Sequence, residues 1–167
     1  LVQELNDVEK LYFSSDQKIA YITQTTLSVF DTQEIVDALE KKFPQILAPK
    51  KSDICYATSN RQTSVQEIAK NVDAFFVIGA FNSSNSIRLV ETAKRFGCDY
   101  SELIENIDNF DYQKLNQYES IGLTASASAP EKQLNLFIDR VKENYKPEVV
   151  DYKEDENIVF KVPNFLN

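Results

Sequence analysis

Several loops of this chain of 167 residues carry small hydroxyl and amide side chains and no charge. They are residues 23–28 (TQTTLS), 82–86 (NSSNS) and 125–129 (ASASA). Each loop follows an apolar segment and precedes an amphipathic helical pattern. Backbone N–H groups and the positive end of the helix dipole converge at a helix N-terminus, so neutral donors there suit a phosphate or diphosphate. In the alternative interpretation, Asn82 or Ser83 caps its helix and the other polar residues only form turns.

The glycines argue against the common nucleotide-binding loops, because the chain contains only Gly79, Gly97 and Gly122. Neither a dinucleotide-binding motif nor a P-loop motif can be built from them. Of the two cysteines, Cys55 lies in a polar loop before a helical pattern and Cys98 lies just past the end of one. A lone cysteine is more often a small buried residue than a metal ligand.

The elements that would hold these loops alternate between strands and helices. This alternation predicts an α/β fold with a mainly parallel sheet, whose ligands bind at the carboxyl ends of the strands. The expected strands are residues 18–23, 73–79, 100–105, 120–124 and 157–162. The expected helices are residues 31–43, a helix that carries Val65 to Val72, a helix that carries Leu89 to Phe96, and residues 130–145.

Two of these helices begin with the spacing of a capping box. Asp31 with Glu34, and Ser128 with Glu131, place an N-cap residue three positions before a glutamate. Pro130 would then lie in the first turn, where its missing N–H has no cost.

The composition restricts the class of protein. With 43% hydrophobic residues the chain can bury a core, as one large domain or two small ones. A net charge of -8 argues against a nucleic-acid surface. No segment approaches the roughly 18 apolar residues that span a bilayer, and no signal-peptide pattern is present. The two cysteines are too few for a disulfide framework and fit a reducing compartment.

The expected division of the chain has a boundary near Ser52, after the stretch 44–51 with its two prolines and paired lysines. The chain contains no His and no Met and begins at Leu1, which leads us to expect that it is incomplete, either because processing removed its start or because it is part of a longer polypeptide.

Together the ordered motifs TQTTLS (23–28), DICYATSNRQ (53–62), NSSNS (82–86), IGLTASASAP (121–130) and ENIVFKVP (156–163) closely resemble the LytB (IspH) family of 4-hydroxy-3-methylbut-2-enyl diphosphate reductases. The resemblance covers essentially the whole chain but only the C-terminal part of the family. By this resemblance, residues 1–51 would be the C-terminal portion of the second α/β unit, residues 52–147 the third unit, and residues 148–167 a C-terminal arm. It implies part of a pseudo-threefold architecture, in which three α/β units surround a [4Fe-4S] cluster that is held by three cysteines. One iron then stays open as a Lewis acid for the substrate hydroxyl.

The activity that the resemblance implies belongs to the non-mevalonate isoprenoid pathway, in the bacterial cytoplasm or the plastid stroma. The family removes the allylic hydroxyl of 4-hydroxy-3-methylbut-2-enyl diphosphate with two electrons and two protons. The products are isopentenyl and dimethylallyl diphosphate. A ferredoxin or a flavodoxin would supply the electrons.

The resemblance also assigns roles to individual residues. Cys55 matches the third cluster cysteine, and a thiolate in a polar loop before a helix is chemically reasonable as an iron ligand. Cys98 matches no ligand of the family and is therefore interpreted as structural. Thr25 matches a threonine near the substrate hydroxyl that relays a proton or fixes a water. Thr26, beside Thr25, matches a residue that shapes the same wall of the substrate site. Ser83, Ser84 and Asn85 match the residues that clamp the diphosphate. Ser128 matches a further serine that binds the same diphosphate. Ser126 stands where the family usually has glycine, which puts the local backbone shape in question.

The family pattern also has two more cluster cysteines, histidines and a proton-supplying glutamate, to which no residue of this chain corresponds. The alternative hypothesis is therefore an isolated, non-catalytic diphosphate-binding α/β module or a degenerate fragment. For the acidic electron carrier, Lys41, Lys42, Lys50 and Lys51 are candidates for a docking patch. The alternative is that Lys41 and Lys42 only complement a helix dipole.

Overall fold

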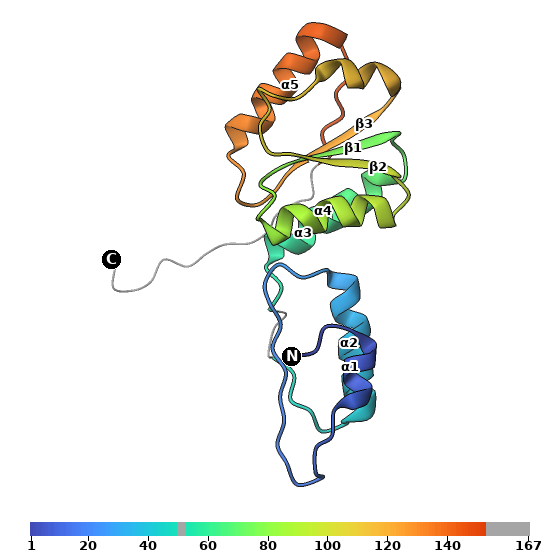
Figure 1. Cartoon of the computed structure of the whole chain (residues 1–167), viewed down its shortest axis with the longest axis vertical. Helices are drawn as coiled ribbons and strands as arrows, with labels where there is room; N and C mark the ends of the chain where they lie inside the picture. Colours follow the sequence, from blue (N-terminus) through green and yellow to red (C-terminus); the bar gives the residue numbers. More distant parts are fainter. Residues whose placement is uncertain (50–52, 153–167) are drawn as a thin grey trace, which may run out of the picture.

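The computed structural model describes residues 1–49 and 53–152 of the chain and shows an elongated molecule with two lobes (Figure 1). The N-terminal lobe is residues 1–49, and the sheet lobe is residues 53–152. The helices are α1 (Leu5–Lys10), α2 (Val29–Lys42), α3 (Tyr56–Ala69), α4 (Ser84–Arg95), the 3-10 helix η1 (Tyr112–Gln117) and α5 (Glu131–Tyr145). The strands are β1 (Ala74–Ile78), β2 (Tyr100–Ile104) and β3 (Ile121–Ala125).

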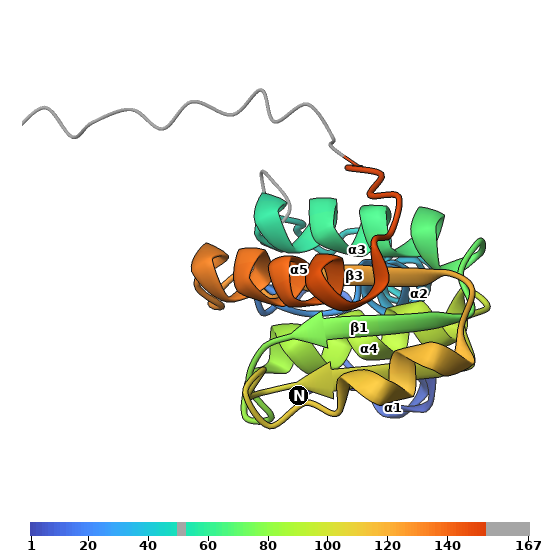
Figure 2. The same cartoon turned by 90° about the horizontal axis from the view of Figure 1, so that it is seen from above.

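The strands form a three-stranded parallel sheet in the order β2-β1-β3. Figure 2 shows β1 in the middle, between the two strands that follow it in sequence. Ala74 pairs with Tyr100 on one side and with Ile121 on the other. Every residue of β1 is buried, as expected of a central strand that helices cover on both faces. The prediction of an α/β fold with a parallel sheet is confirmed.

Alternate residues of β1 supply two separate hydrophobic cores. Phe75 and Val77 pack with residues of α3 and α4, and these helices lie between the sheet and the N-terminal lobe (Figure 1). Phe76 and Ile78 pack on the opposite face with Phe137 of α5. The sheet is therefore the middle of three layers, and its carboxyl edge is left for loops.

Asp73 links two strands at the opposite end of the sheet, where the strands begin. Its carboxylate accepts hydrogen bonds from Ser120 N at 2.8 Å, Ser120 Oγ at 2.9 Å and Glu119 N at 3.0 Å. The bond from the Ser120 backbone is the main reason why the pKa of the Asp73 carboxyl is lowered from its ordinary value of 3.8. The contact joins the residues that precede β1 and β3 and so fixes the register of the two strands.

The strand expected at residues 18–23 is not formed. The segment makes a single parallel bridge between Ala20 and Leu47, with Tyr21 N bound to Leu47 O at 3.2 Å. Two extended segments without a third strand do not make a stable sheet, which explains why the apolar pattern did not become a strand in the described chain. The strand expected at 157–162 lies outside the described residues.

Two helix starts differ from the capping boxes predicted. The N-cap of α2 is Ser28, whose Oγ accepts from Asp31 N at 3.2 Å, so Asp31 lies in the first turn and is not the cap. For α5 the N-cap is Pro130, and Ser128 stays in the preceding loop. In both cases the capping-box pattern located the helix but placed its start wrongly. The short helices α1 and η1 have no counterpart in the predictions.

Lys42 belongs to the contact between α1 and α2. Its Nζ donates to Val8 O at 2.9 Å and to Glu9 O at 2.6 Å, at the end of α1. The lysine thus satisfies carbonyls of a neighbouring helix, and its part in a docking patch stays a prediction. Lys50 and Lys51 lie outside the described residues.

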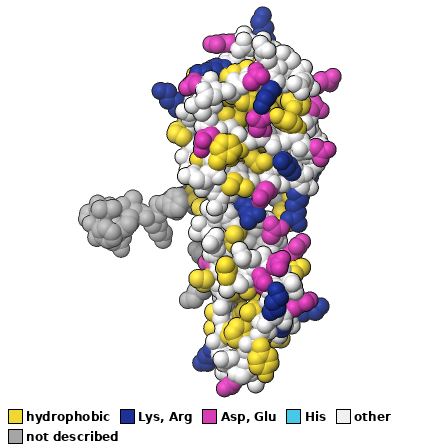
Figure 3. Space-filling view, in the orientation of Figure 1, with side chains coloured by type: hydrophobic (Ala, Val, Ile, Leu, Met, Phe, Trp, Pro, Cys, Tyr) yellow, Lys and Arg dark blue, Asp and Glu magenta, His cyan; other side chains and the backbone are white. Residues whose placement is uncertain are grey.

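The surface is mixed in charge. Figure 3 shows acidic and basic side chains interspersed over one face, without a continuous basic area. In the part of the chain that the structure describes, no helix has both the length and the apolar character needed to cross a membrane.

Candidate functional site

The loops that follow β1 and β3 meet at the carboxyl edge of the sheet. Ser126 N donates to Ile78 O at 2.8 Å, which joins the two loops where their strands end. A Cβ on Gly79 would lie 2.3 Å from Ser86 Oγ and 3.0 Å from Ser126 Oγ, so both hydroxyls crowd against the glycine. Gly79 is required here because any side chain would displace these serines.

The NSSNS segment was predicted as a loop, but Ser84 to Ser86 form the first turn of α4, and the segment contains both a helix cap and polar groups without partners. Ser83 is the N-cap of α4, and its Oγ accepts from Ser86 N at 3.3 Å, which leaves its hydroxyl proton free to be donated. Ser84 is exposed. Asn85 is 5% exposed, yet its Oδ1 and Nδ2 are buried and find no hydrogen-bond partner within the described residues, and the same holds for Ser86 Oγ. Buried polar atoms of this kind are rare in native proteins and indicate a missing partner.

The loop after β3 adds further hydroxyls to this edge. Ser126 is 1% exposed, and its Oγ lies 3.4 Å from Ser128 Oγ. Ser128 itself is exposed. Among the residues that the structure describes, Lys146 is the only non-glycine with positive φ, so Ser126 does not need the backbone freedom of glycine.

The structure brings Cys55 and the Thr25 loop together. Cys55 is the N-cap of α3 and is exposed, and its N–H donates to Thr25 O at 3.0 Å. Asp53 Oδ2 accepts from Thr23 N at 2.9 Å and holds the start of the same loop. Thr25 is exposed and Thr26 is half-buried. In the described ranges 1–49 and 53–152, no group of three or more His, Cys, Asp or Glu side chains could hold a metal ion.

Two residues of α3 that the sequence analysis missed connect these loops. Gln62 is 1% exposed, and its Nε2 donates to Leu27 O at 3.0 Å while its Oε1 accepts from Val29 N at 3.1 Å. Arg61 donates through Nε to Ala125 O at 3.2 Å, at the end of β3. The detectable signal was a glutamine on the buried stripe of a helix that also contains Thr58, Val65 and Ala69.

The two cysteines have opposite environments. Cys98 is 1% exposed within the core under α4, and burial raises the pKa of its thiol above the ordinary value. Its Sγ donates to Tyr100 O at 3.3 Å. The interpretation of Cys98 as structural agrees with this environment, whereas the exposed Cys55 is accessible to reagents.

We therefore expect iodoacetamide to modify Cys55 and to spare Cys98 in the folded, reduced chain, because only Cys55 is exposed. Mass spectrometry after short labelling should find one adduct on the peptide that contains Cys55. In urea both cysteines should react. Equal labelling of the two under native conditions would contradict the buried position of Cys98.

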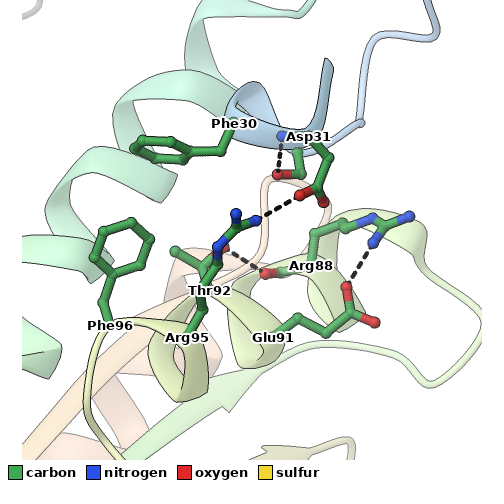
Figure 4. Close-up of a pocket in the computed structure, with 8 residues that line it drawn as sticks. Phe30, Asp31, Arg88, Glu91, Thr92, Arg95 and Phe96 are labelled. Carbon is green, nitrogen blue, oxygen red and sulfur yellow. Dashed lines mark hydrogen bonds and ion pairs between the residues drawn. The ribbon is translucent and has the colours of Figure 1, made fainter. Parts of the chain in front are cut away.

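The contact between α2 and α4 forms a pocket of about 70 Å³ (Figure 4). Arg95 donates to Asp31 Oδ1 at 2.5 Å, and the rings of Phe30 and Phe96 lie 5.2 Å apart between centroids. The charged groups in the pocket are paired with one another, and its volume is too small for a branched diphosphate. This contact joins the start of α2 to the end of α4 and is not the candidate ligand site.

A second pocket, of about 320 Å³, lies in the N-terminal lobe beside Phe13 and Phe43. None of the predicted site residues lines either pocket. The predicted residues instead lie on two loop clusters, one around Cys55 and Thr25 and one around Asn85 and Ser128. Arg61 and Gln62 join both clusters to α3.

Comparison with known proteins identifies relatives of this chain. The LytB protein family matches residues 1–142. The 4-hydroxy-3-methylbut-2-enyl diphosphate reductase of Ruegeria sp. (strain TM1040) is 46% identical over 168 residues, which cover 99% of this chain and 53% of that protein. The protein of the same name from Proteus mirabilis is 44% identical over 167 residues, with 99% and 52% covered.

Among solved structures, the E-1-hydroxy-2-methyl-but-2-enyl-4-diphosphate reductase from Plasmodium falciparum matches with a TM-score of 0.85 and 36% identity. The match covers 99% of this chain and 53% of that one. The chain thus spans about half the length of the curated relatives it matches. Since the family match extends over most of its residues, the chain belongs to the LytB protein family.

Proposed function

We propose that this chain is the C-terminal part of an iron–sulfur reductase that converts 4-hydroxy-3-methylbut-2-enyl diphosphate to isopentenyl and dimethylallyl diphosphate. The observation that carries the proposal is the set of buried polar atoms without partners, Asn85 Oδ1, Asn85 Nδ2 and Ser86 Oγ, at the carboxyl edge of the sheet. A diphosphate oxygen that accepts from Asn85 Nδ2 would remove part of the cost of burying them.

In this function the sheet lobe binds the diphosphate end of the substrate. The Ser83 hydroxyl, which already accepts a hydrogen bond from Ser86 N, donates a hydrogen bond to a diphosphate oxygen. The exposed hydroxyls of Ser84 and Ser128 donate further hydrogen bonds to the diphosphate. The positive end of the α4 dipole adds to this attraction. Neutral donors hold the anion in place without placing a cation beside it.

The reacting end of the substrate lies at the Thr25 loop in this proposal. The C–O bond to the allylic hydroxyl breaks, two electrons and two protons are consumed, and the hydroxyl leaves as water. Thr25 holds or relays the proton at that hydroxyl, and Thr26 shapes the wall beside it. A [4Fe-4S] cluster, when bound, supplies the electrons and a Lewis-acidic iron.

Cys55 is suited to hold that cluster because it is exposed, free and fixed at the N-cap of α3 next to Thr25. It would supply one of three thiolates. The remaining ligands, the histidines and the proton-supplying glutamate would come from the rest of the full-length protein, by which we mean the longer polypeptide to which this chain is proposed to belong.

The other parts of the proposal concern organisation and partners. The boundary near Ser52 would separate two of three α/β units, and residues 148–167 would form the C-terminal arm. A ferredoxin or flavodoxin would deliver the electrons, with exposed Lys41 among the residues that attract it. The compartment would be the bacterial cytoplasm or the plastid stroma.

The 167-residue chain by itself is expected to bind diphosphate without holding a stable [4Fe-4S] cluster, because Cys55 is its single accessible thiol in the described residues. Anaerobic reconstitution followed by iron analysis and absorbance measures this. The full-length protein should take up about four irons and the chain none. A stable, stoichiometric cluster on the chain alone would contradict this ligand assignment.

The proposed function itself is tested on the reconstituted full-length protein. With a small chemical reductant, it should convert 4-hydroxy-3-methylbut-2-enyl diphosphate to the two isomeric products. Failure of the cluster-loaded protein to convert this substrate would reject the reductase and favour the alternative of a non-catalytic diphosphate-binding module.

A further inference from the structure

The backbone of the loop between the bridge at Ala20 and helix α2 is held at alternate residues by one segment of the sheet lobe. Thr23 N is bound by Asp53 Oδ2 at 2.9 Å, and Thr25 O accepts from Cys55 N at 3.0 Å. The carbonyl of Leu27 and the N–H of Val29 complete the series, and both are bound by the side chain of Gln62. Thr25 therefore lies between two residues, Thr23 and Leu27, whose backbone groups are held by hydrogen bonds to the sheet lobe.

The contact made by Gln62 differs from an ordinary surface hydrogen bond. The side chain is 1% exposed, so water cannot replace its partners. It uses its donor and its acceptor at once, at 3.0 Å to Leu27 O and 3.1 Å from Val29 N. Val29 is the first residue of α2, where no carbonyl of the helix itself is available to its N–H.

We infer that Gln62 is a positioning residue for the reaction, which sets the place of Thr25 relative to Cys55 by fixing the chain two and four residues further on. The inference rests on the proposed function. The amide of Gln62 both donates to Leu27 O and accepts from Val29 N, which neither an apolar side chain nor a carboxylate can do. A shift of the Thr25 loop by about 1 Å is enough to lower the rate of a reaction by up to roughly a hundredfold.

The test uses two variants of Gln62 in the reconstituted full-length protein. Gln62→Leu removes both hydrogen bonds. Gln62→Glu keeps an acceptor for Val29 N but places a carboxylate against Leu27 O, and it is the second variant if the first does not fold. The matched control is Gln66→Leu, at a half-buried glutamine one turn further along α3.

The first measurement is hydrogen exchange of the peptide that covers residues 23–30, which does not depend on activity. We expect faster exchange in both Gln62 variants than in Gln66→Leu. Exchange equal to that of the control would overturn the inference, since the loop would not then depend on Gln62.

The second measurement separates kcat from KM with a small chemical reductant. The Gln62 variants should lower kcat by about tenfold or more and change KM by less than about twofold, because the diphosphate clamp is untouched. In a Thr25→Ala background the same variants should cause no further loss of kcat. A loss of equal size in that background, or a rise in KM that matches the fall in kcat, would show a merely structural role and reject the inference.

The two proposals fail in different ways. If the unaltered full-length protein does not turn over the substrate, the proposed function fails, and the exchange experiment still decides whether Gln62 fixes the Thr25 loop.

Discussion

Replacing Asn85 by leucine is expected to stabilise the protein and to weaken its binding of diphosphate. Both polar atoms of the Asn85 side chain are buried without a partner, so an apolar side chain with the same number of heavy atoms removes an unfavourable burial. We expect the free energy of unfolding of the 167-residue chain to rise by about 1 kcal/mol. Urea titration measures this.

The same variant loses a donor to the ligand. Diphosphate binding by the full-length protein should weaken by about 2 kcal/mol, or roughly 30-fold, as measured by calorimetry. Gln62→Leu is the matched comparison, because Gln62 is also a buried amide but has both partners. That variant should destabilise the chain. If Asn85→Leu also destabilised it and left binding unchanged, NSSNS would be an ordinary helix start.

Gly79→Ala is expected to disrupt the same site by overpacking. The added Cβ would lie 2.3 Å from Ser86 Oγ and 2.9 Å from Ser86 Cβ, and because Ser86 is fully buried, it can shift only by disturbing the packing around it. We expect a loss of about 1 to 3 kcal/mol in the free energy of unfolding. Because Ser86 and Ser126 must shift, the binding of diphosphate should fall by more than about tenfold.

Gly122→Ala is the control for this variant. Its Cβ would lie 2.4 Å from Phe75 Cδ2, so the steric conflict is similar but lies in the core, away from the loops. We expect a comparable loss of stability and, at a temperature where the chain is folded, unchanged affinity. If the two variants weakened binding equally, the effect of Gly79→Ala would come from general destabilisation and not from displaced serines.

The sheet could be predicted from the sequence because its signals are local. Residues 74–78 form an apolar run between Asp73 and Gly79, and the NSSNS loop contains the residue types of a helix cap. The structure has β1 over these residues and Ser83 as the cap of α4. These two patterns, which depend only on neighbouring residues, were therefore interpreted correctly, whereas the equally local capping-box patterns misplaced the starts of α2 and α5.

The missed features depend on contacts distant in sequence. The segment 18–23 has the composition of a strand, but a strand needs partners, and the described chain supplies only the bridge to Leu47. Gln62 gave no prediction because Leu27 and Val29 are far from it in sequence. The lack of partners at Asn85 is likewise a property of the packed structure and cannot be read from the residue types.

The central position of β1 has a consequence for how the chain folds. Its neighbours β2 and β3 both follow it in sequence, and parallel pairing requires a crossover before each of them. During synthesis the Ala-Phe-Phe-Val-Ile run of β1 is therefore made before either of the strands that pair with it. This run has the high β-propensity and low charge of an aggregation-prone segment. Burial between two later strands protects this segment in the native state, so the newly made chain exposes an aggregation-prone segment until β3 has paired with it.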